Sequence, residues 1–455
     1  MARSPDTIAA LATPAGTAAL AVIRITGPDT ERLARELAGS PPRPRTARRG
    51  EYRDRTGTIL DEVLFTFFPG PRSATGEHVL EISCHGNPFI AQRMLGDLFA
   101  RGCRPADPGE FTRRAFLNGK MDLSQAEAVM DLISARSERA LAAAHRQLRG
   151  SLGRHLAPLV NDLISALAAV EAYIDFPEED LPGENREALR NTLGSVRTGT
   201  RQLLATRRYG DLLRDGVRTV IVGETNAGKS SLLNRLLGKD RAIVSPEPGT
   251  TRDFIEERAV VGPHSLRLID TAGLNPAPGP VERLGIAKTL ECIEEADIIV
   301  LVLDATRPTP PVDPRTAGRL TADRTIVALN KTDLPHGSAG PGFVAKALPG
   351  LVAVPVSALT GAGIDALKSE IIRRADGFQP EAGEDTVAVN ARHAHALLTA
   401  DECIGQALGK IDANSPAELL ASDLRGALNA LGEISGRIDN EQVLDRLFSE
   451  FCIGK

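Results

Sequence analysis

Residues 219–237 read TVIVGETNAGKSSLLNRLL, and this stretch decides the fold of the centre of the chain. A short apolar run, residues 219–222, leads into Gly223, and leucines at helical spacing follow Lys229. The residues between them match GxxxxGK[ST], in which glycines let backbone amides wrap phosphates and the lysine reaches the β- and γ-phosphate oxygens. The stretch therefore predicts a strand, a phosphate-binding loop and a helix.

The rest of the central region repeats the same alternation. Short, largely apolar runs are separated by segments of helix length, and they lie at residues 266–269, 298–303, 325–329 and 351–356. Strands that are apolar on both faces and alternate with helices are typical of a doubly wound parallel sheet. We therefore expect a P-loop domain built on such a sheet.

Polar motifs follow three of these strands, where the ligands of open α/β sheets bind. Asp270-Thr-Ala-Gly273 places a carboxylate behind a metal ion and a glycine amide near the γ-phosphate. Asn330-Lys-Thr-Asp333 offers a carboxylate that accepts two hydrogen bonds from guanine, a pair that adenine cannot donate. Residues 357–359, Ser-Ala-Leu, fit a second guanine loop. Together with the P-loop and the threonines of residues 248–253, these motifs predict GTP binding.

The predicted nucleotide site draws on all five motifs. Its residues are Asn226, Ala227, Gly228, Lys229, Ser230, Ser231, Ser245, Pro246, Glu247, Pro248, Gly249, Thr250, Thr251, Asp270, Thr271, Ala272, Gly273, Asn330, Lys331, Thr332, Asp333, Ser357, Ala358 and Leu359. Among them, Ser230 and Thr251 supply hydroxyl groups for Mg²⁺.

Hydrolysis needs groups that these motifs do not supply. Ras-like switches orient the attacking water with a glutamine after the Asp-x-x-Gly motif, but Leu274 stands there. Asn226 lies where it can coordinate a monovalent cation beside the phosphates, and a potassium ion there would supply the charge of an arginine finger. Glu282 is the candidate for orienting the water; the alternative is a solvated acid at a helix start.

The chain on either side of this domain shows two other residue patterns, one typical of strands and one typical of helices. Before residue 120, β-type runs at residues 20–25, 63–68 and 78–83 end at Gly/Pro turns, which indicates an α+β domain. Helical periodicity begins near Asp122, where residues 124–127 read as a capping box, and resumes after residue 377. We predict three domains, the third inserted into the second, with the boundaries 1–120, 121–216 plus 377–455, and 217–376.

Composition excludes several classes of protein. The 455 residues carry a net charge of -5 and are 42% hydrophobic, which argues against a disordered, collagen-like or strongly basic chain. No secretory signal or apolar run of the ~20 residues needed to span a bilayer is evident. We therefore expect no membrane association. Five cysteines without a CxxC pair predict a reducing cytoplasm. The chain has no Trp and three Tyr, so aromatic stacking can contribute little to ligand binding.

One stretch is strongly basic. Residues 43–55 contain six arginines against Glu51 and Asp54. They read either as a patch that contacts phosphates or as an exposed connecting loop. The arginines are Arg43, Arg45, Arg48, Arg49, Arg53 and Arg55.

The whole chain resembles the MnmE (TrmE) family of tRNA modification GTPases. The nucleotide motifs carry part of the resemblance, including VERLG at residues 281–285. Outside them, DTIAA, ATPAG, the long block PGEFTRRAFLNGKMDL and the terminal FCIGK also match, at residues 6–10, 12–16, 108–123 and 451–455.

The resemblance implies specific ligands. The N-terminal region would be a dimerisation domain like folate-binding aminomethyltransferases, and the tetrahydrofolate (5-formyl or methylene) would be held by Arg24, Glu81, Lys120 and Lys455. Taken alone, the first two could equally form a surface salt bridge. Potassium would be surrounded by Asn226, Ser245, Glu247 and Thr250, and Glu282 would position water. Cys452 is either a nucleophile or a small buried hydrophobe.

The function that the resemblance implies is a potassium-stimulated GTPase acting on tRNA. It would form a homodimer and a heterotetramer with an FAD-containing, MnmG-like partner, and it would install a (carboxymethyl)aminomethyl group at C5 of wobble uridine. Two alternatives stay open: a GTP-dependent ribosome-assembly switch, and a self-contained aminomethyltransferase whose GTPase is only regulatory.

Overall fold

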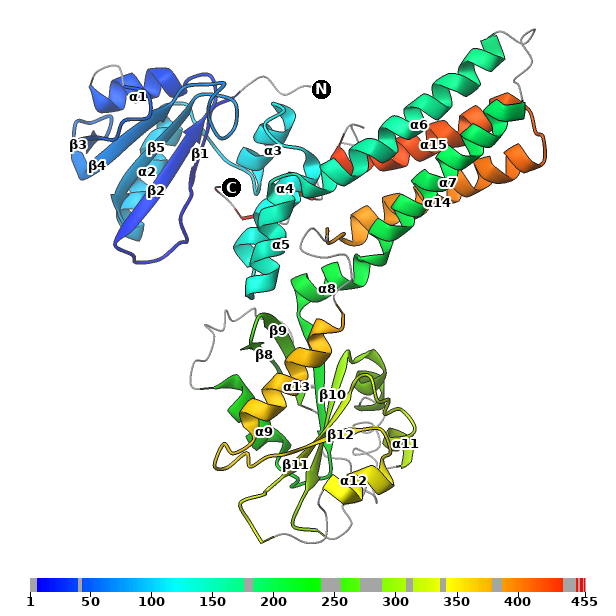
Figure 1. Cartoon of the computed structure of the whole chain (residues 1–455). Coiled ribbons are helices and arrows are strands. Elements are labelled where there is room, and N and C mark those ends of the chain that lie inside the picture. Colours follow the sequence, from blue (N-terminus) through cyan, green and yellow to red (C-terminus); the bar gives the residue numbers. More distant parts are fainter. Residues whose placement is uncertain are drawn as a thin grey trace, which may run out of the picture. The chain divides into compact units, whose positions relative to one another are not determined.

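The structure is a computed structural model, shown in Figure 1. It describes residues 6–39, 43–175, 183–238, 255–270, 289–307, 314–335, 341–378, 387–436, 447–448, 451–452 and 454. Contacts divide the chain into two compact units. The first consists of Met1–Met130, Leu148–Gly153 and Leu431–Lys455, and the second of Asp131–Gln147 and Arg154–Ala430. The helical segments are thus divided between both units, so the three domain boundaries stay a prediction.

A six-stranded sheet with the order β3-β4-β5-β2-β1-β6 forms the centre of the first unit. Neighbouring strands are antiparallel except for the parallel pair β1 and β6. The strands are β1 (Ile8–Leu11), β2 (Leu20–Thr26), β3 (Arg48–Arg53), β4 (Ile59–Phe68), β5 (Val79–His85) and β6 (Arg104–Pro105).

Helices α1 (Thr30–Ala38) and α2 (Pro88–Ala100) supply the other half of this core. Alternate residues of β2, such as Ile23 and Ile25, are fully buried and join Leu33 of α1 and Met94 of α2 in one apolar cluster. Asn87 caps α2 by accepting hydrogen bonds from the first backbone amides, and Pro88 stands at its first position. The predicted α+β fold of this region is confirmed.

Two further helices, α3 (Glu110–Leu117) and α4 (Leu123–Ser134), follow the sheet. The capping box of α4 lies two residues before the predicted one. Asp122 accepts from the backbone amide of Gln125 at 2.8 Å, and the Gln125 side chain accepts from the amide of Asp122 at 2.9 Å. Ser124 and Glu127, the predicted pair, are buried inside the helix. Asp122 precedes the same apolar repeat and is as good an N-cap residue as Ser124, so the helix begins after Asp122.

The C-terminal residues return to this region. Phe448 and Phe451 pack with Leu123 and Ala126 of α4 in a small apolar cluster. The backbone amide of Gly109 donates to the carbonyl of Cys452 at 3.3 Å. The end of the chain is therefore part of the first unit.

Six helices from the two helical regions of the sequence lie mainly in the second unit. They are α5 (Glu138–Leu148), α6 (Ser151–Asp175), α7 (Gly183–Ala205), α8 (Arg207–Asp215), α14 (Ala391–Asp412) and α15 (Ala417–Ser435). Helices α7 and α14 run side by side (Figure 1). Arg197 and Arg201 of α7 both pair with Asp401 of α14, at 3.0 and 2.7 Å.

One of these helices is long and apolar enough to cross a membrane by length and composition. An 18-residue window of α6 has a mean hydropathy of 1.3, and 17% of that window is buried. Its buried residues recur at helical spacing and include Leu156, Leu163 and Val170. Arg154 and Asp162 are exposed on the same helix. A single helix of this kind is weak grounds for a membrane span, since helices of soluble proteins pass the same test.

The second sheet has the order β12-β11-β10-β7-β9-β8 and is parallel except for β8, which runs antiparallel to β9. Its strands are β7 (Val217–Gly223), β8 (Ile255–Val261), β9 (His264–Asp270), β10 (Ile298–Asp304), β11 (Thr325–Asn330) and β12 (Val352–Pro355). Helices α9 (Lys229–Leu237), α11 (Pro314–Ala317), α12 (Pro341–Ala347) and α13 (Ile364–Asp376) accompany it.

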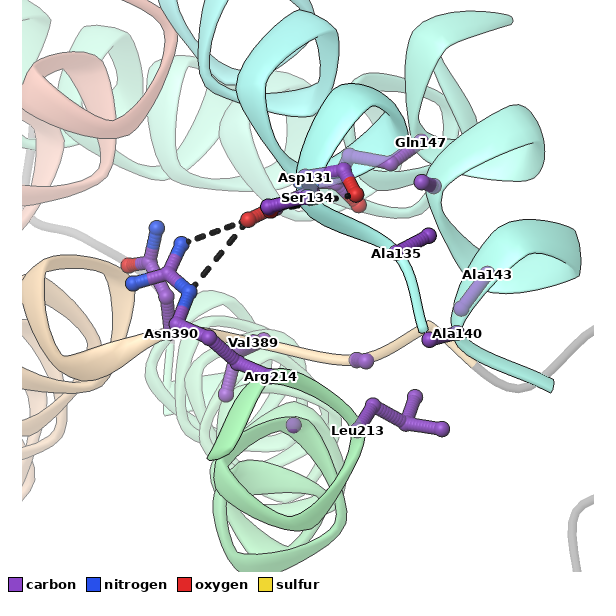
Figure 2. Close-up of a pocket in the computed structure, with 13 residues that line it drawn as sticks. Asp131, Ser134, Ala135, Ala140, Ala143, Gln147, Leu213, Arg214, Val389 and Asn390 are labelled. Carbon is purple, nitrogen blue, oxygen red and sulfur yellow. Dashed lines mark hydrogen bonds and ion pairs between the residues drawn. The ribbon is translucent and has the colours of Figure 1, made fainter. Parts of the chain in front are cut away.

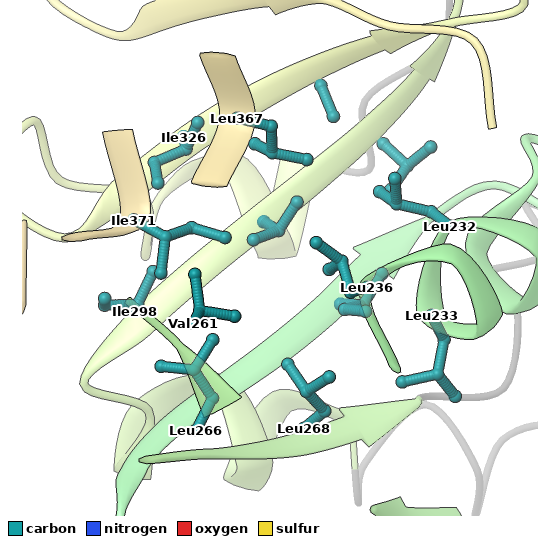
Figure 3. Close-up of a cluster of buried hydrophobic side chains, with 14 of the residues drawn as sticks. Leu232, Leu233, Leu236, Val261, Leu266, Leu268, Ile298, Ile326, Leu367 and Ile371 are labelled. Carbon is teal, nitrogen blue, oxygen red and sulfur yellow. The ribbon is translucent and has the colours of Figure 1, made fainter. Parts of the chain in front are cut away.

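Apolar side chains cover both faces of this sheet. Ile298 and Val300 of β10 point into a cluster with leucines of α9 and α13 (Figure 3), whereas Ile299 and Leu301 face a second cluster. Burial on both faces explains the continuous apolar runs in the sequence. The predicted doubly wound sheet is confirmed.

Candidate nucleotide-binding site

The P-loop follows β7 at the centre of the second sheet, and two glycines in it are required by close packing. A Cβ on Gly223 would lie 2.4 Å from the carbonyl oxygen of Val302, and one on Gly228 would lie 2.1 Å from Nδ2 of Asn330. Both have positive φ, at 153° and 98°. Larger residues would displace the loop from β10 and β11. Helix α9 begins at the next residue, Lys229, so its free amides face the loop.

Lys229 is a buried cation held ready for an anion. Its side chain is 7% exposed, and its Nζ donates to the carbonyl of Glu224 at 3.0 Å. Burial lowers the pKa of this ammonium, while Asp270 and Glu224 act in the opposite direction. A phosphate oxygen would supply the charge partner that water cannot provide here.

Ser230 and Asp270 form the second part of the phosphate region. The Ser230 hydroxyl donates to Oδ2 of Asp270 at 2.8 Å. The other oxygen, Oδ1, is buried and has no hydrogen-bond partner among the described residues. A hydroxyl and an unsatisfied carboxylate oxygen are ligands that suit Mg²⁺, directly or through water. These two residues therefore fit the predicted metal, which would neutralise phosphate charge when bound.

Asn330 joins the phosphate loop to the predicted guanine loop. It is 2% exposed, its Nδ2 donates to the carbonyl of Ala227 at 2.8 Å, and its Oδ1 accepts from the amide of Ala358 at 2.9 Å. Nearby, the Ser357 hydroxyl donates to Oδ1 of Asp333 at 2.6 Å. The structure thus brings the three predicted loops together and fixes the carboxylate that would read the base.

Lys331 sits in the left-handed region, with φ at 68°. Its ammonium pairs with Asp304 at 2.7 Å. Burial alone would raise the pKa of the Asp304 carboxyl, but hydrogen bonds from Lys331 and Thr306 outweigh it and hold that pKa below its ordinary value. Of the other predicted residues, the amide of Thr332 donates to the carbonyl of Val356, whereas Ser231 and Leu359 are exposed.

Twelve of the 30 predicted site residues lie outside the described residues. Only Asn226 of the potassium set is described, with φ at 65°. The predicted residues outside the described ranges are Ser245, Pro246, Glu247, Pro248, Gly249, Thr250, Thr251, Thr271, Ala272, Gly273, Glu282 and Lys455. Their roles stay predictions.

The first unit contains the predicted folate residues. Arg24 on β2 stands opposite Glu81 on β5, and its guanidinium donates to the Glu81 carboxylate at 2.8 and 3.0 Å. Arg24 also donates to the carbonyl of Gly454 at 3.3 Å and lies 5.8 Å from the centre of the Phe111 ring. Both predicted readings, a salt bridge and a ligand site, are consistent with this geometry. It places the C-terminal tail beside the pair.

Among the described residues, no hydrogen bond or ion pair joins the two other candidates of that region, Lys120 and Cys452, to the pair of Arg24 and Glu81. Lys120 donates to the carbonyl of Pro71 at 3.0 Å. Cys452 is exposed, which disfavours the buried-hydrophobe reading of this cysteine. The other four cysteines are buried or half-buried.

Comparison with known proteins shows where the chain belongs. The family profile described as GTP-binding protein TrmE N-terminus matches residues 7–120, and the one described as MnmE helical domain matches residues 123–452. A protein of Opitutus terrae named tRNA modification GTPase MnmE is 59% identical over 450 residues, covering 99% of each chain. The chain belongs to the MnmE family. A relative from Akkermansia muciniphila with the same name is 45% identical over 454 residues, covering 99% of each chain.

A crystal structure of Era from Aquifex aeolicus is 30% identical and covers 41% of this chain and 66% of that one, with a TM-score of 0.29.

Sequence reasoning missed a hollow of about 60 Å³ in the second unit (Figure 2). It lies where α5, α8 and the residues before α14 meet, and small side chains line much of it, including Ala140 and Ala143. An ion pair of 2.9 Å between Asp131 and Arg214 stands at its edge. A Cβ on Gly210, which also lines the hollow, would lie 2.2 Å from the carbonyl oxygen of Val389.

Its lining residues are spread over distant parts of the sequence, and no motif joins them. They are Asp131, Ser134, Ala135, Ala140, Ala143, Ala144, Gln147, Gly210, Leu213, Arg214, Ala388, Val389 and Asn390. Spacing alone therefore gives no signal for this feature.

Proposed function

We propose that this chain hydrolyses GTP as part of tRNA modification. Its family membership makes it a GTP hydrolase. The observation that carries the site is the phosphate region itself, where buried Lys229 lies beside the pair formed by Ser230 and Asp270. Lys229 would bind the β- and γ-phosphate oxygens, and the pair would hold Mg²⁺. Asp333, fixed by Ser357, would select guanine.

Activation of the attacking water needs residues other than those that bind the phosphates, Mg²⁺ and guanine. We propose that Glu282 orients it, and that Asn226, Ser245, Glu247 and Thr250 surround a potassium ion whose charge stabilises the transition state. Asn226 adopts the left-handed conformation, which asparagine tolerates better than most residues, and its place in the phosphate-binding loop supports its part in this set.

The first unit would supply one-carbon chemistry. We propose that Arg24 and Glu81, with Lys120 and Lys455, bind 5-formyl- or methylene-tetrahydrofolate. A glutamate suits the donor edge of the pterin, and cationic side chains suit the folate carboxylates. Because the tail reaches Arg24 through Gly454, Cys452 would stand near the folate.

In the complete reaction, the protein would act in the cytoplasm as a homodimer. It would form a heterotetramer with an MnmG-like protein that carries FAD, and it would place a (carboxymethyl)aminomethyl group on C5 of wobble uridine. The name of the relatives, tRNA modification GTPase, supports the substrate class.

Mass spectrometry of tRNA nucleosides tests this function. Cells that lack the gene should lose a modified wobble uridine, and the wild-type gene should restore it while a Glu282→Ala gene should not. Unchanged wobble nucleosides together with a defect in ribosomal subunits would favour the ribosome-assembly alternative. Retained modification with Glu282→Ala would favour a regulatory GTPase.

The cation is tested separately by comparing GTP hydrolysis in K⁺ and in Na⁺. Hydrolysis should be much faster in K⁺, and an Asn226→Ala protein should lose this difference. Equal rates in the two salts for the wild-type protein would refute the potassium proposal.

A further inference from the structure

Three short segments of the first unit converge beside the end of β4. The backbone amide of Arg45 donates to the carbonyl of Phe67 at 2.7 Å, which holds residues 43–46 against that strand. The side chain of Asn118 donates to the carbonyl of Thr75 at 2.8 Å, which ties the turn after α3 to the loop that follows β4. Residues from all three segments are thereby brought together.

This convergence gathers cations. The Arg45 guanidinium donates to the carbonyl of Arg72, and the Lys120 ammonium donates to the carbonyl of Pro71 at 3.0 Å. These carbonyls belong to consecutive residues, so the two cations contact the same short loop, which also carries Arg72. We call Arg43, Arg45, Arg72 and Lys120 the turn patch; all four are exposed.

Carboxylates do not neutralise the turn patch. Within the described part of the chain, no acidic side chain forms an ion pair with any of its four cations. The recorded side-chain partners of Arg45 and Lys120 are carbonyl oxygens, which carry no net charge. The cationic charge of the patch is therefore available to an external anion.

Other arginines of the same basic stretch behave differently. Arg49 pairs with Glu62 at 2.7 Å, and Arg53 pairs with Glu51 across an exposed surface. Arg49 and Arg53 of β3 are thus neutralised by carboxylates, whereas Arg43 and Arg45 of the turn form no ion pair with a described carboxylate. Arg55 lies further along the chain, where its guanidinium donates to the carbonyl of Ala100. The two readings of the sequence therefore apply to different parts of the stretch, and the turn arginines are the candidates for a patch that contacts phosphates.

We propose that the turn patch binds phosphates of the tRNA backbone. This inference rests on the proposed function in tRNA modification. A chain with a net charge of -5 repels RNA on average, so RNA must be bound where positive charge is concentrated. The protein has no Trp and three Tyr beside 13 Phe, so base stacking is limited and we expect phosphate contacts to supply much of the affinity. Arginine suits this role because its planar fork matches phosphate geometry.

The backbone at Arg45 supports the assignment. Its φ of 56° lies in the left-handed region, which favours glycine, and yet a long cationic side chain occupies the position. A strained residue persists only where the surrounding structure holds it, and such residues cluster at ligand sites.

The test is binding of labelled tRNA transcripts with a wobble uridine to the full-length protein, measured by fluorescence anisotropy at several salt concentrations. The test variant is Arg45→Ala/Arg72→Ala. The matched control is Arg49→Ala/Arg53→Ala, which removes the same charge from strand β3 of the same sheet. Lys120 is left intact because it belongs to the proposed folate site.

We expect the test variant to lose about tenfold or more in affinity at low salt and to reduce the slope of log affinity against log salt by about 2, one for each phosphate contact. The control should stay within about twofold of the wild type, since its arginines are already paired. GTP hydrolysis should be unchanged in both proteins.

Equal tRNA binding by the wild type and the test variant would overturn the inference while leaving the proposed function intact. A loss of affinity for 5-formyltetrahydrofolate instead of tRNA would also overturn it and would assign the patch to folate carboxylates. If the wild type binds no tRNA and tRNA nucleosides are unchanged in cells that lack the gene, the proposed function fails together with the inference.

Discussion

At the scale of single residues, Asn330 has a role that its motif does not reveal. The motif places it before the base-reading carboxylate, but its own amide bridges Ala227 and Ala358. Neither bond is evident from spacing, because both partners are backbone atoms of distant loops. The motifs thus suffice to predict phosphate and guanine residues, whereas the connection between their loops required the structure.

Replacing Asn330 by alanine should destabilise the second unit and weaken GTP binding. The change leaves a buried carbonyl and a buried amide without their partners, at a cost of about 1 to 3 kcal/mol each. We expect a loss of about 2 to 6 kcal/mol in urea unfolding and at least about tenfold in GTP affinity. Asn234→Ala, on the exposed side of α9, is the control and should cost less than about 0.5 kcal/mol. Equal effects of the two variants would contradict the bridging role.

Asp333→Asn should change the base that is recognised. In the proposed site the carboxylate would accept two hydrogen bonds from guanine, whereas an amide would present one donor where guanine also donates. We expect GTP affinity to fall by about a hundredfold, since hydrogen bonds to charged groups contribute about 1.5 to 3 kcal/mol each. Xanthosine triphosphate carries a carbonyl at C2, where guanine carries its exocyclic amine. It should therefore bind the variant more tightly than GTP does. Competition between the two nucleotides measures this, and an unchanged preference for GTP would refute the role of Asp333.

At the scale of elements, strands that are buried on both faces were predicted from the sequence, and an exposed strand was not. Strands β7, β10 and β11 are buried on both faces and stood out as apolar runs. Strand β3 was read only as a basic stretch, because a single residue of its six, Tyr52, is buried and the strand lies at the sheet edge. Its pairing with β4 depends on backbone hydrogen bonds, which leave no periodic signal in the side chains.

The hairpin of β8 and β9 carries a charge cluster with a defined pH response. His264 is buried, its Nε2 lies 2.8 Å from Oδ1 of Asp376 on α13, and Arg139 of α5 lies 2.7 Å from the same oxygen. Burial lowers the pKa of His264, helped by Arg139, while Asp376 acts in the opposite direction. The folded protein therefore binds this proton less tightly than the unfolded chain does.

Unfolding consequently takes up a proton, and the second unit should lose stability as the pH falls below about 6.5, the ordinary histidine value. Urea unfolding between pH 7.5 and pH 5.5 measures the loss. His264→Gln keeps a donor for Asp376 but cannot titrate, so it should show a smaller loss over the same range. An identical pH dependence in the two proteins would exclude His264 as the source.

At the scale of the whole molecule, the two units have separate cores and separate candidate ligands. The nucleotide residues lie in the second unit, and Arg24 and Glu81 lie in the first. The sequence correctly indicated an α+β region, helices and a P-loop fold. It could not show how contacts divide the helices, because helical periodicity states which face is buried and not which neighbour covers it.

Calorimetry should therefore resolve more than one transition. A ligand that binds only the folded form stabilises the part that binds it, by about 2.7 kcal/mol at a hundred times its dissociation constant. GDP with Mg²⁺ should raise the melting temperature of one transition, and 5-formyltetrahydrofolate should raise that of the other. A single transition that both ligands shift equally would show that the units unfold together.

The close approach of Gly210 to Val389 has a consequence for the history of the chain. The backbone that leads into the P-loop fold and the backbone that leaves it touch at one point, with no room for a Cβ between them. A domain whose first and last residues lie close together can be inserted into another domain, or removed from it, with little change to the host. If the P-loop fold is an insertion, as the predicted domain order has it, insertion at that point would need no other change in the helices on either side. Conversely, excision between these two residues needs only a very short linker to reconnect the scaffold.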